Sequence, residues 1–103
     1  MNLDNLQKLV FEECCKNGYT EMWNKAGKIG DIAEMGLVNT EVSEALEELR
    51  KKEVDENHLA EECADIIIRV LNFMSRKGLD ADIAIFSKHQ KNMTRGYLHG
   101  KGV

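Results

Sequence analysis

Two short stretches of the chain each carry two acidic residues three positions apart. EVSEALEEL contains Glu41 and Glu44, and ECAD contains Glu62 and Asp65. Residues three apart lie on one face of an α-helix, so each pair projects from one side. If the two helices are neighbours, four carboxylates meet, and their repulsion raises their pKa values unless a cation offsets it.

Oxygen ligands of this kind are typical of a magnesium site, in which Mn²⁺ can substitute. Mg²⁺ prefers carboxylate oxygens and keeps waters and substrate phosphates among its ligands. Neither stretch contains histidine, which disfavours zinc and the Glu-x-x-His type of di-iron site. The alternative is an ordinary helix surface, in which Asp65 pairs with Arg69 four residues further on.

The elements that position these acids are predicted to be helices. The chain has 103 residues and no proline, which suits one domain over residues 1–103. Its apolar periodicity and stop signals predict four main helices and one loop. The helices are expected at about 2–17, 31–52, 57–77 and 80–93, with Asn57 capping the third, and the loop at 19–30. The predicted fold class is therefore an all-α, four-main-helix bundle, in which the two acid-bearing helices are antiparallel neighbours.

Composition excludes several classes of protein. The chain is 43% hydrophobic and 31% charged with a net charge of −4, which indicates a soluble globular domain and argues against a nucleic-acid polymer as partner. No apolar run approaches the length of a membrane span, and the N-terminus does not resemble a signal peptide. The three cysteines lack metal-binding spacing, so we expect free thiols and a cytoplasmic location.

A resemblance becomes visible from about residue 35 to residue 100. The segment that includes NTEVSEALEELRKK and HLAEECADIIIRVLNFMSRKGLDADIAIFSKHQKNMTR resembles the MazG-like branch of the all-α nucleoside triphosphate pyrophosphatase superfamily. The family hallmark is E-x-x-E, a spacer and E-x-x-D, matched here by the four acids. A second hallmark, K-x-x-x-N-x-x-R, is matched by Lys88, Asn92 and Arg95.

The resemblance implies a Mg²⁺-dependent hydrolase that cleaves nucleoside triphosphates between the α- and β-phosphates, giving monophosphate and pyrophosphate. The resemblance further implies that this hydrolysis serves housecleaning of the nucleotide pool. It implies that the four acids are the metal ligands and catalytic residues, one of them orienting a water. Lys88 and Arg95 would neutralise phosphate oxygens, and Asn92 would bond a phosphate or sugar. Judged alone, these three residues also fit the basic end and cap of a surface helix.

Other residues are candidates for contact with the nucleoside. Trp23 can stack on a base, and Asn24 and Lys28 beside it can contact phosphates. Asn72, seven residues after Asp65, lies on nearly the same helix face and can read a sugar or base. The alternatives are that Trp23 plugs the end of a small bundle and that Asn72 is solvated.

The resemblance also implies a homo-oligomer, either a dimer or a dimer of dimers, with sites near subunit contacts. A small domain has a small core, so burial between subunits would add to its stability. Two other functions compete with the hydrolase. One is a helical interaction module whose acidic stripe faces water. The other is a protein that binds nucleotide or divalent cation without turnover.

Overall fold

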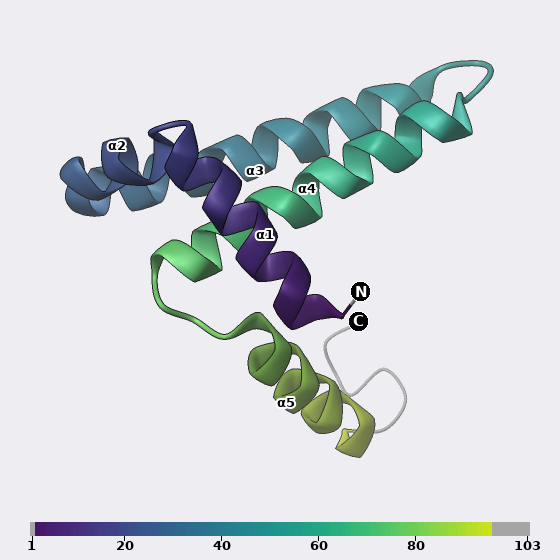
Figure 1. The fold of residues 1–103 in the computed structure, drawn as a ribbon. Helices are drawn as coiled ribbons and strands as arrows, with labels where there is room; N and C mark the ends of the chain where they lie inside the picture. The colour runs from purple at the N-terminus through teal and green to yellow at the C-terminus, as the bar shows by residue number, and fades with distance from the viewer. Residues whose placement is uncertain (1, 96–103) are drawn as a thin grey trace.

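The computed structural model describes residues 2–95, which form five α-helices and no strand (Figure 1). The helices are α1 (Leu3–Lys16), α2 (Tyr19–Lys25), α3 (Gly27–Arg50), α4 (Glu56–Arg76) and α5 (Ala81–Thr94). The predicted all-α class is confirmed. The segment 96–103 lies outside the described residues. Among those described, no helix is both long enough and apolar enough to cross a membrane.

Three helices begin at a side chain that accepts a hydrogen bond from the first turn. Asn2 caps α1, Asp55 caps α4 and Asp80 caps α5. The expectation that Asn57 caps the third predicted helix was wrong, because the helix starts earlier, at Glu56. A carboxylate is an equally good cap, since its oxygen accepts the free backbone N–H of the third residue along.

The loop predicted over residues 19–30 was wrong. Helix α2 occupies its first half, and α3 begins in the second half. Gly18, with φ of +81°, provides the left-handed residue that separates α1 from α2. No proline interrupts the backbone hydrogen bonds here, so the aromatic and lysine-rich sequence is free to turn helical.

The two longest helices form an antiparallel hairpin that positions the acidic pairs (Figure 1). Glu48 contacts His58, while Glu34, about four helical turns earlier on α3, contacts Arg76 near the end of α4. Contacting residues thus run in opposite directions along the two helices. Helix α1 packs against α4, and α2 packs against α3.

The contact between α3 and α4 is polar, and we call it the polar seam. On α3 it consists of residues seven apart, which is two helical turns: Glu34, Glu41 and Glu48. On α4 the seam residues alternate in steps of four and three: His58, Glu62, Asp65, Arg69, Asn72 and Arg76. This is the spacing of a coiled-coil seam, with charged and amide side chains where apolar residues normally lie.

The apolar stripes of these helices face away from the seam. Ile32, Val42 and Leu46 belong to the apolar periodicity of α3, but all three are exposed, as is Ile67 of α4. Among the described residues, only three apolar side chains are buried: Ala45, Leu71 and Ala81. A small core agrees with the expectation for a domain of this size, and a closed four-helix bundle stays a prediction.

Helix α5 is attached to the rest of the chain largely through one glutamine. The Gln7 side chain donates to the carbonyl oxygen of Leu79 at 2.9 Å and accepts from the backbone N–H of Ala81 at 3.1 Å. Both Gln7 and Ala81 are buried. The remainder of α5 is exposed.

Two glycines of α3 offer a matched test of the close approach of α2. A Cβ at Gly30 would overlap the carbonyl oxygen of Trp23 and lie 2.9 Å from the Cβ of Ala26, whereas a Cβ at Gly36 meets nothing within 4 Å. Gly30→Ala should therefore destabilise the fold by about 1–3 kcal/mol. Gly36→Ala should stabilise it by about 0.5–1 kcal/mol through helix propensity. Urea unfolding of both variants checks this, and a neutral Gly30→Ala would show that α2 does not pack as described.

Candidate metal centre and adjoining pocket

Three of the four predicted acids meet at the middle of the polar seam. One carboxylate oxygen from each of Glu41, Glu62 and Asp65 lies within 4.8 Å of the others. Glu41 and Glu62 are buried, whereas Asp65 is exposed. Like charges at this separation repel strongly, so the cluster needs a counter-charge.

Glu44 lies at the edge of the same cluster. Its pKa is raised above the ordinary value of 4.5, first by the neighbouring carboxylate of Glu62 and then by that of Glu41. The structure therefore brings all four predicted acids to one place, with Glu44 at the exposed edge of the cluster.

Counter-charges reach the cluster from two sides. Arg69 Nε donates to Glu41 Oε1 at 2.8 Å. His58 Nε2 lies 3.0 Å from Glu62 Oε1. Within the described residues Arg69 forms its ion pair across the seam, and not with Asp65 on its own helix. Two of the four acids are thus paired, while Glu44 and Asp65 have no cationic partner in residues 2–95.

His58 connects the cluster to a buried carboxylate at the turn of the hairpin. Its Nδ1 lies 2.6 Å from Glu48 Oε1, and Glu48 is only 1% exposed. Glu48 also accepts from the Asp55 backbone N–H and from Lys51, and these bonds hold its pKa at about 2. The hydrogen bond to Glu48 raises the pKa of His58. An imidazolium donates from both ring nitrogens, which satisfies Glu48 and Glu62 together.

The cluster passes a simple test of fit for a hard divalent cation. Its donors are all carboxylate oxygens, which Mg²⁺ prefers. Glu62 Oε2 is buried and has no hydrogen-bond partner within residues 2–95, although the other oxygen of Glu62 is bonded to His58. A buried carboxylate oxygen without a partner is costly, and a metal ion removes that cost. The residues present therefore suit Mg²⁺ or Mn²⁺.

The other end of the seam is a second charged network. Glu34, 4% exposed, accepts from Asn72 Nδ2 at 3.0 Å and from Arg76 Nε at 2.8 Å. Arg76 continues to Asp31 and to the side-chain oxygen of Asn24. Hydrogen bonds from Lys77 and then Arg76 lower the pKa of Asp31. These partners hold the Glu34 carboxylate in one orientation.

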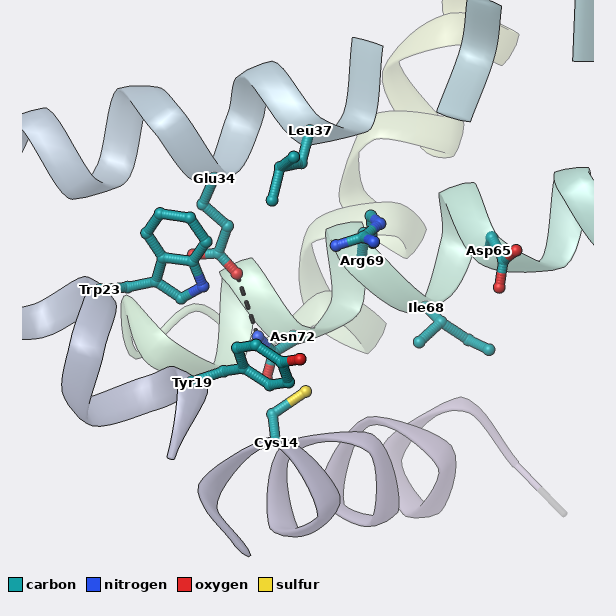
Figure 2. A pocket seen from close by; sticks show the side chains of 9 residues that line it. All are labelled: Cys14, Tyr19, Trp23, Glu34, Leu37, Asp65, Ile68, Arg69 and Asn72. Carbon is teal, nitrogen blue, oxygen red and sulfur yellow. Dashed lines mark hydrogen bonds between the residues drawn. The ribbon is translucent and has the colours of Figure 1, made fainter. Parts of the chain in front are cut away.

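A pocket of about 410 Å³ lies between this network and the carboxylate cluster (Figure 2). Four helices line it, through Cys14, Tyr19, Trp23, Glu34, Leu37, Asp65, Ile68, Arg69 and Asn72. Asp65 belongs to both the pocket and the cluster, so the pocket opens onto the candidate metal ligands. Apolar and aromatic walls with a few placed polar groups are typical of a small-molecule site.

The remaining predicted site residues fall into two groups. Trp23 and Asn72 line the pocket, whereas Asn24 is bonded to Arg76 and Lys28 is exposed and does not line it. The second group is on α5, which lies at the opposite end of α4 from the hairpin turn (Figure 1). Its members are exposed and do not line the pocket: Lys88, Asn92 and Arg95. One chain therefore does not bring them to the carboxylates.

Sequence reasoning missed residues that hold the site in shape. Glu34 and Glu48 were not named as site residues, although they lie seven positions before and after Glu41. His58, four positions before Glu62, was also missed. The signal was present in the repeat of acids at heptad spacing on α3, which marks one continuous face.

Comparison of the chain with family models, curated proteins and solved structures gave no match.

The lowered pKa of Glu48 predicts how stability depends on pH. A carboxyl whose pKa falls from 4.5 to about 2 on folding stabilises the folded state above pH 4.5, and this contribution is lost as pH falls towards 2. Glu48→Gln should be less stable than the wild type at pH 7, and the difference should shrink between pH 4.5 and 2. Thermal melts across this range check it, with the exposed neighbour Glu47→Gln as control. A difference that does not change with pH would contradict the assignment.

Proposed function

We propose that this protein is a Mg²⁺-dependent nucleoside triphosphate pyrophosphatase of the MazG-like type. It would cleave (d)NTP between the α- and β-phosphates to (d)NMP and pyrophosphate. The observation that carries the proposal is the meeting of Glu41, Glu62 and Asp65 within 4.8 Å beside a pocket large enough for a nucleoside. The acids and the pocket share Asp65, so a ligand in the pocket can extend phosphates towards the acids.

Each acid has a role that follows from its surroundings. When bound, Mg²⁺ neutralises phosphate charge and lowers the pKa of an attacking water. Glu41, Glu62 and Asp65 would hold the ion. Glu44 lies at the exposed edge, where the neighbouring carboxylates raise its pKa and so increase its basicity. It would therefore orient the water and take its proton.

The pocket would hold the nucleoside. Trp23 offers an aromatic face for stacking on the base. At the other end, Arg69 lines the pocket next to Asp65 and carries a guanidinium suited to phosphate oxygens. The order along the pocket is thus base, sugar, phosphates and then the carboxylates.

We further propose that the protein is a dimer or a dimer of dimers, and that each site is shared between copies. The outward apolar stripes of α3 and α4 are a surface that a second copy would bury. Helix α5 does not reach the carboxylates of its own chain. Lys88, Asn92 and Arg95 would contact the phosphates bound by a neighbouring copy.

Two features favour the non-catalytic alternatives. The exposed apolar stripes also suit a helical interaction module, and Arg69 and His58 already neutralise two of the acids. Release of pyrophosphate separates the hydrolase from both alternatives. Stabilisation of the fold by Mg²⁺ separates a cation-binding protein from an interaction module.

Replacement of single acids should abolish turnover without loss of stability. The raised pKa of Glu44 means that its ionised form destabilises the apo protein at any pH above that pKa, so Glu44→Gln should melt at the same temperature or higher. Asp65→Asn should behave in the same way, because it relieves repulsion. Both variants, and the wild type in excess chelator, should release less than about one-hundredth of the wild-type pyrophosphate.

Glu61→Gln is the matched control, because Glu61 is an exposed acid of α4. It should retain full activity. Two results would overturn the proposal: full turnover in chelator, or diphosphate and orthophosphate as products. A large drop in the apo melting temperature of Glu44→Gln would show that the acid is a structural partner instead.

Mixing two inactive variants tests whether sites are shared. In a two-fold dimer of Asp65→Asn with Arg95→Ala, one site carries both changes and the other carries neither. After random exchange of subunits, about a quarter of wild-type activity should return. Arg95→Ala alone should bind Mn²⁺ normally and lose kcat or raise KM. If verified mixed dimers recover no activity, α5 and the acids of one site belong to the same chain. A fully active protein that is monomeric by light scattering would refute the oligomer.

A further inference from the structure

Asn72 is a buried pocket residue whose hydrogen bonding is incomplete. It is 5% exposed, and its Nδ2 donates to Glu34 Oε2 at 3.0 Å. Its Oδ1 is buried and has no partner in the described chain. Buried polar atoms are nearly always paired, so an unpaired amide oxygen in the wall of a pocket indicates that a ligand supplies the missing donor.

The orientation of this amide is fixed by its neighbours. Turning it over would place Oδ1 against Glu34 Oε2, and two acceptors would face each other. Glu34 cannot turn away, because Arg76 holds its other oxygen at 2.8 Å. Arg76 is in turn held by Asp31 and Asn24. The wall therefore presents a hydrogen-bond acceptor, and the network behind it prevents a switch to a donor.

This part of the pocket contains two acceptors side by side. Figure 2 shows the Glu34 carboxylate bonded to the Asn72 amide, with the Trp23 ring beside them. Both side chains line the pocket. A flat group stacked on Trp23 would direct its edge at Asn72 Oδ1 and at the carboxylate. An edge that offers N–H groups is attracted there, and one that offers carbonyl oxygens is repelled.

We propose that Asn72 selects nucleobases that carry an exocyclic amine, and disfavours bases whose exocyclic groups are all carbonyls. An amine has two N–H bonds on one nitrogen, so it can donate to Asn72 Oδ1 and to Glu34 together. Cytosine, adenine and guanine have this group, whereas uracil and hypoxanthine do not. The proposal rests on the proposed function and adds the class of substrate.

The ring N–H of uracil or hypoxanthine does not replace the amine. In both bases this N–H stands next to a carbonyl, and donation to Asn72 would bring that carbonyl oxygen towards the Glu34 carboxylate. A site built to pair with a donor rejects analogues that lack it, because its own acceptor is then left unpaired. We expect a preference of at least about tenfold in kcat/KM from this one contact.

A panel of five triphosphates tests the proposal with wild-type protein: dCTP, dATP, dGTP, dUTP and dITP, each with Mg²⁺. Within it, dCTP and dUTP differ only by amine against carbonyl and by the hydrogen on the adjacent ring nitrogen, and so do dATP and dITP. We expect dUTP and dITP to be the two poorest substrates, at least about tenfold below the best amine-bearing one. Equal use of dUTP or dITP and the best amine-bearing substrate would overturn the proposal.

Substitution of Asn72 connects the preference to this residue. Asn72→Leu keeps the size of the side chain and removes the acceptor, so the ratio of dCTP to dUTP in kcat/KM should fall towards one. Asn57→Leu is the matched control, because Asn57 is an exposed asparagine near the start of the same helix, and it should keep the wild-type ratio. An unchanged ratio in a folded Asn72→Leu would assign the preference to another group.

Measurement of nucleotide binding without turnover tests the base preference independently of the proposed pyrophosphatase activity. If none of the five triphosphates is hydrolysed, the pyrophosphatase proposal fails, and calorimetry with dCMP against dUMP and dAMP against dIMP still tests the pocket. The amine-bearing member of each pair should bind at least about tenfold more tightly. Equal affinity within both pairs, or no binding of any of the four, would overturn the inference.

Discussion

The rest of the structure depends on one constraint: α3 and α4 pack through charged side chains, so each buried charge in the polar seam needs a partner. At the turn of the hairpin, Glu48 is fully paired by Lys51, His58 and the backbone of Asp55. At the other end, Glu34 is paired by Asn72 and Arg76. The middle is different, because four acids face Arg69 and one side of His58. The paired ends fix the hairpin, and the middle keeps an excess of negative charge.

This arrangement explains why the apolar residues face outwards. A helix has only one side towards its partner, and on α3 that side is occupied by residues spaced seven apart around Glu41. Val42 and Leu46 therefore lie on the outer surface, where they remain exposed in a single chain. The same geometry leaves α5 fastened mainly by Gln7 and away from the carboxylates. A second copy would account for both features at once, because it would bury the apolar stripes and bring a basic helix to the acids.

The sequence predicted the helices better than it predicted their packing. Apolar periodicity and stop signals located α1, α4 and α5 to within a few residues, and the two acid pairs do meet. The same periodicity was misleading about burial, because it shows that a helix has two faces and does not show which one a single chain covers. The mixture of aromatic and lysine residues over 19–30 predicted a loop, yet most of this segment is helical, and Gly30 is where α3 passes close to Trp23. His58 was missed because its role depends on Glu48, a contact made only by the fold.

We propose above that the acids in the middle of the seam, Glu41, Glu62 and Asp65, form a site for a divalent cation. Titration of the metal-free protein with Mn²⁺, followed by electron paramagnetic resonance, tests this most directly, because it requires neither substrate nor turnover. The account predicts saturable binding that Mg²⁺ displaces, that Asp65→Asn weakens and that Glu61→Gln leaves unchanged. If Mn²⁺ stays free at millimolar concentration, or if Asp65→Asn binds it as well as the wild type, the acids do not form a metal site.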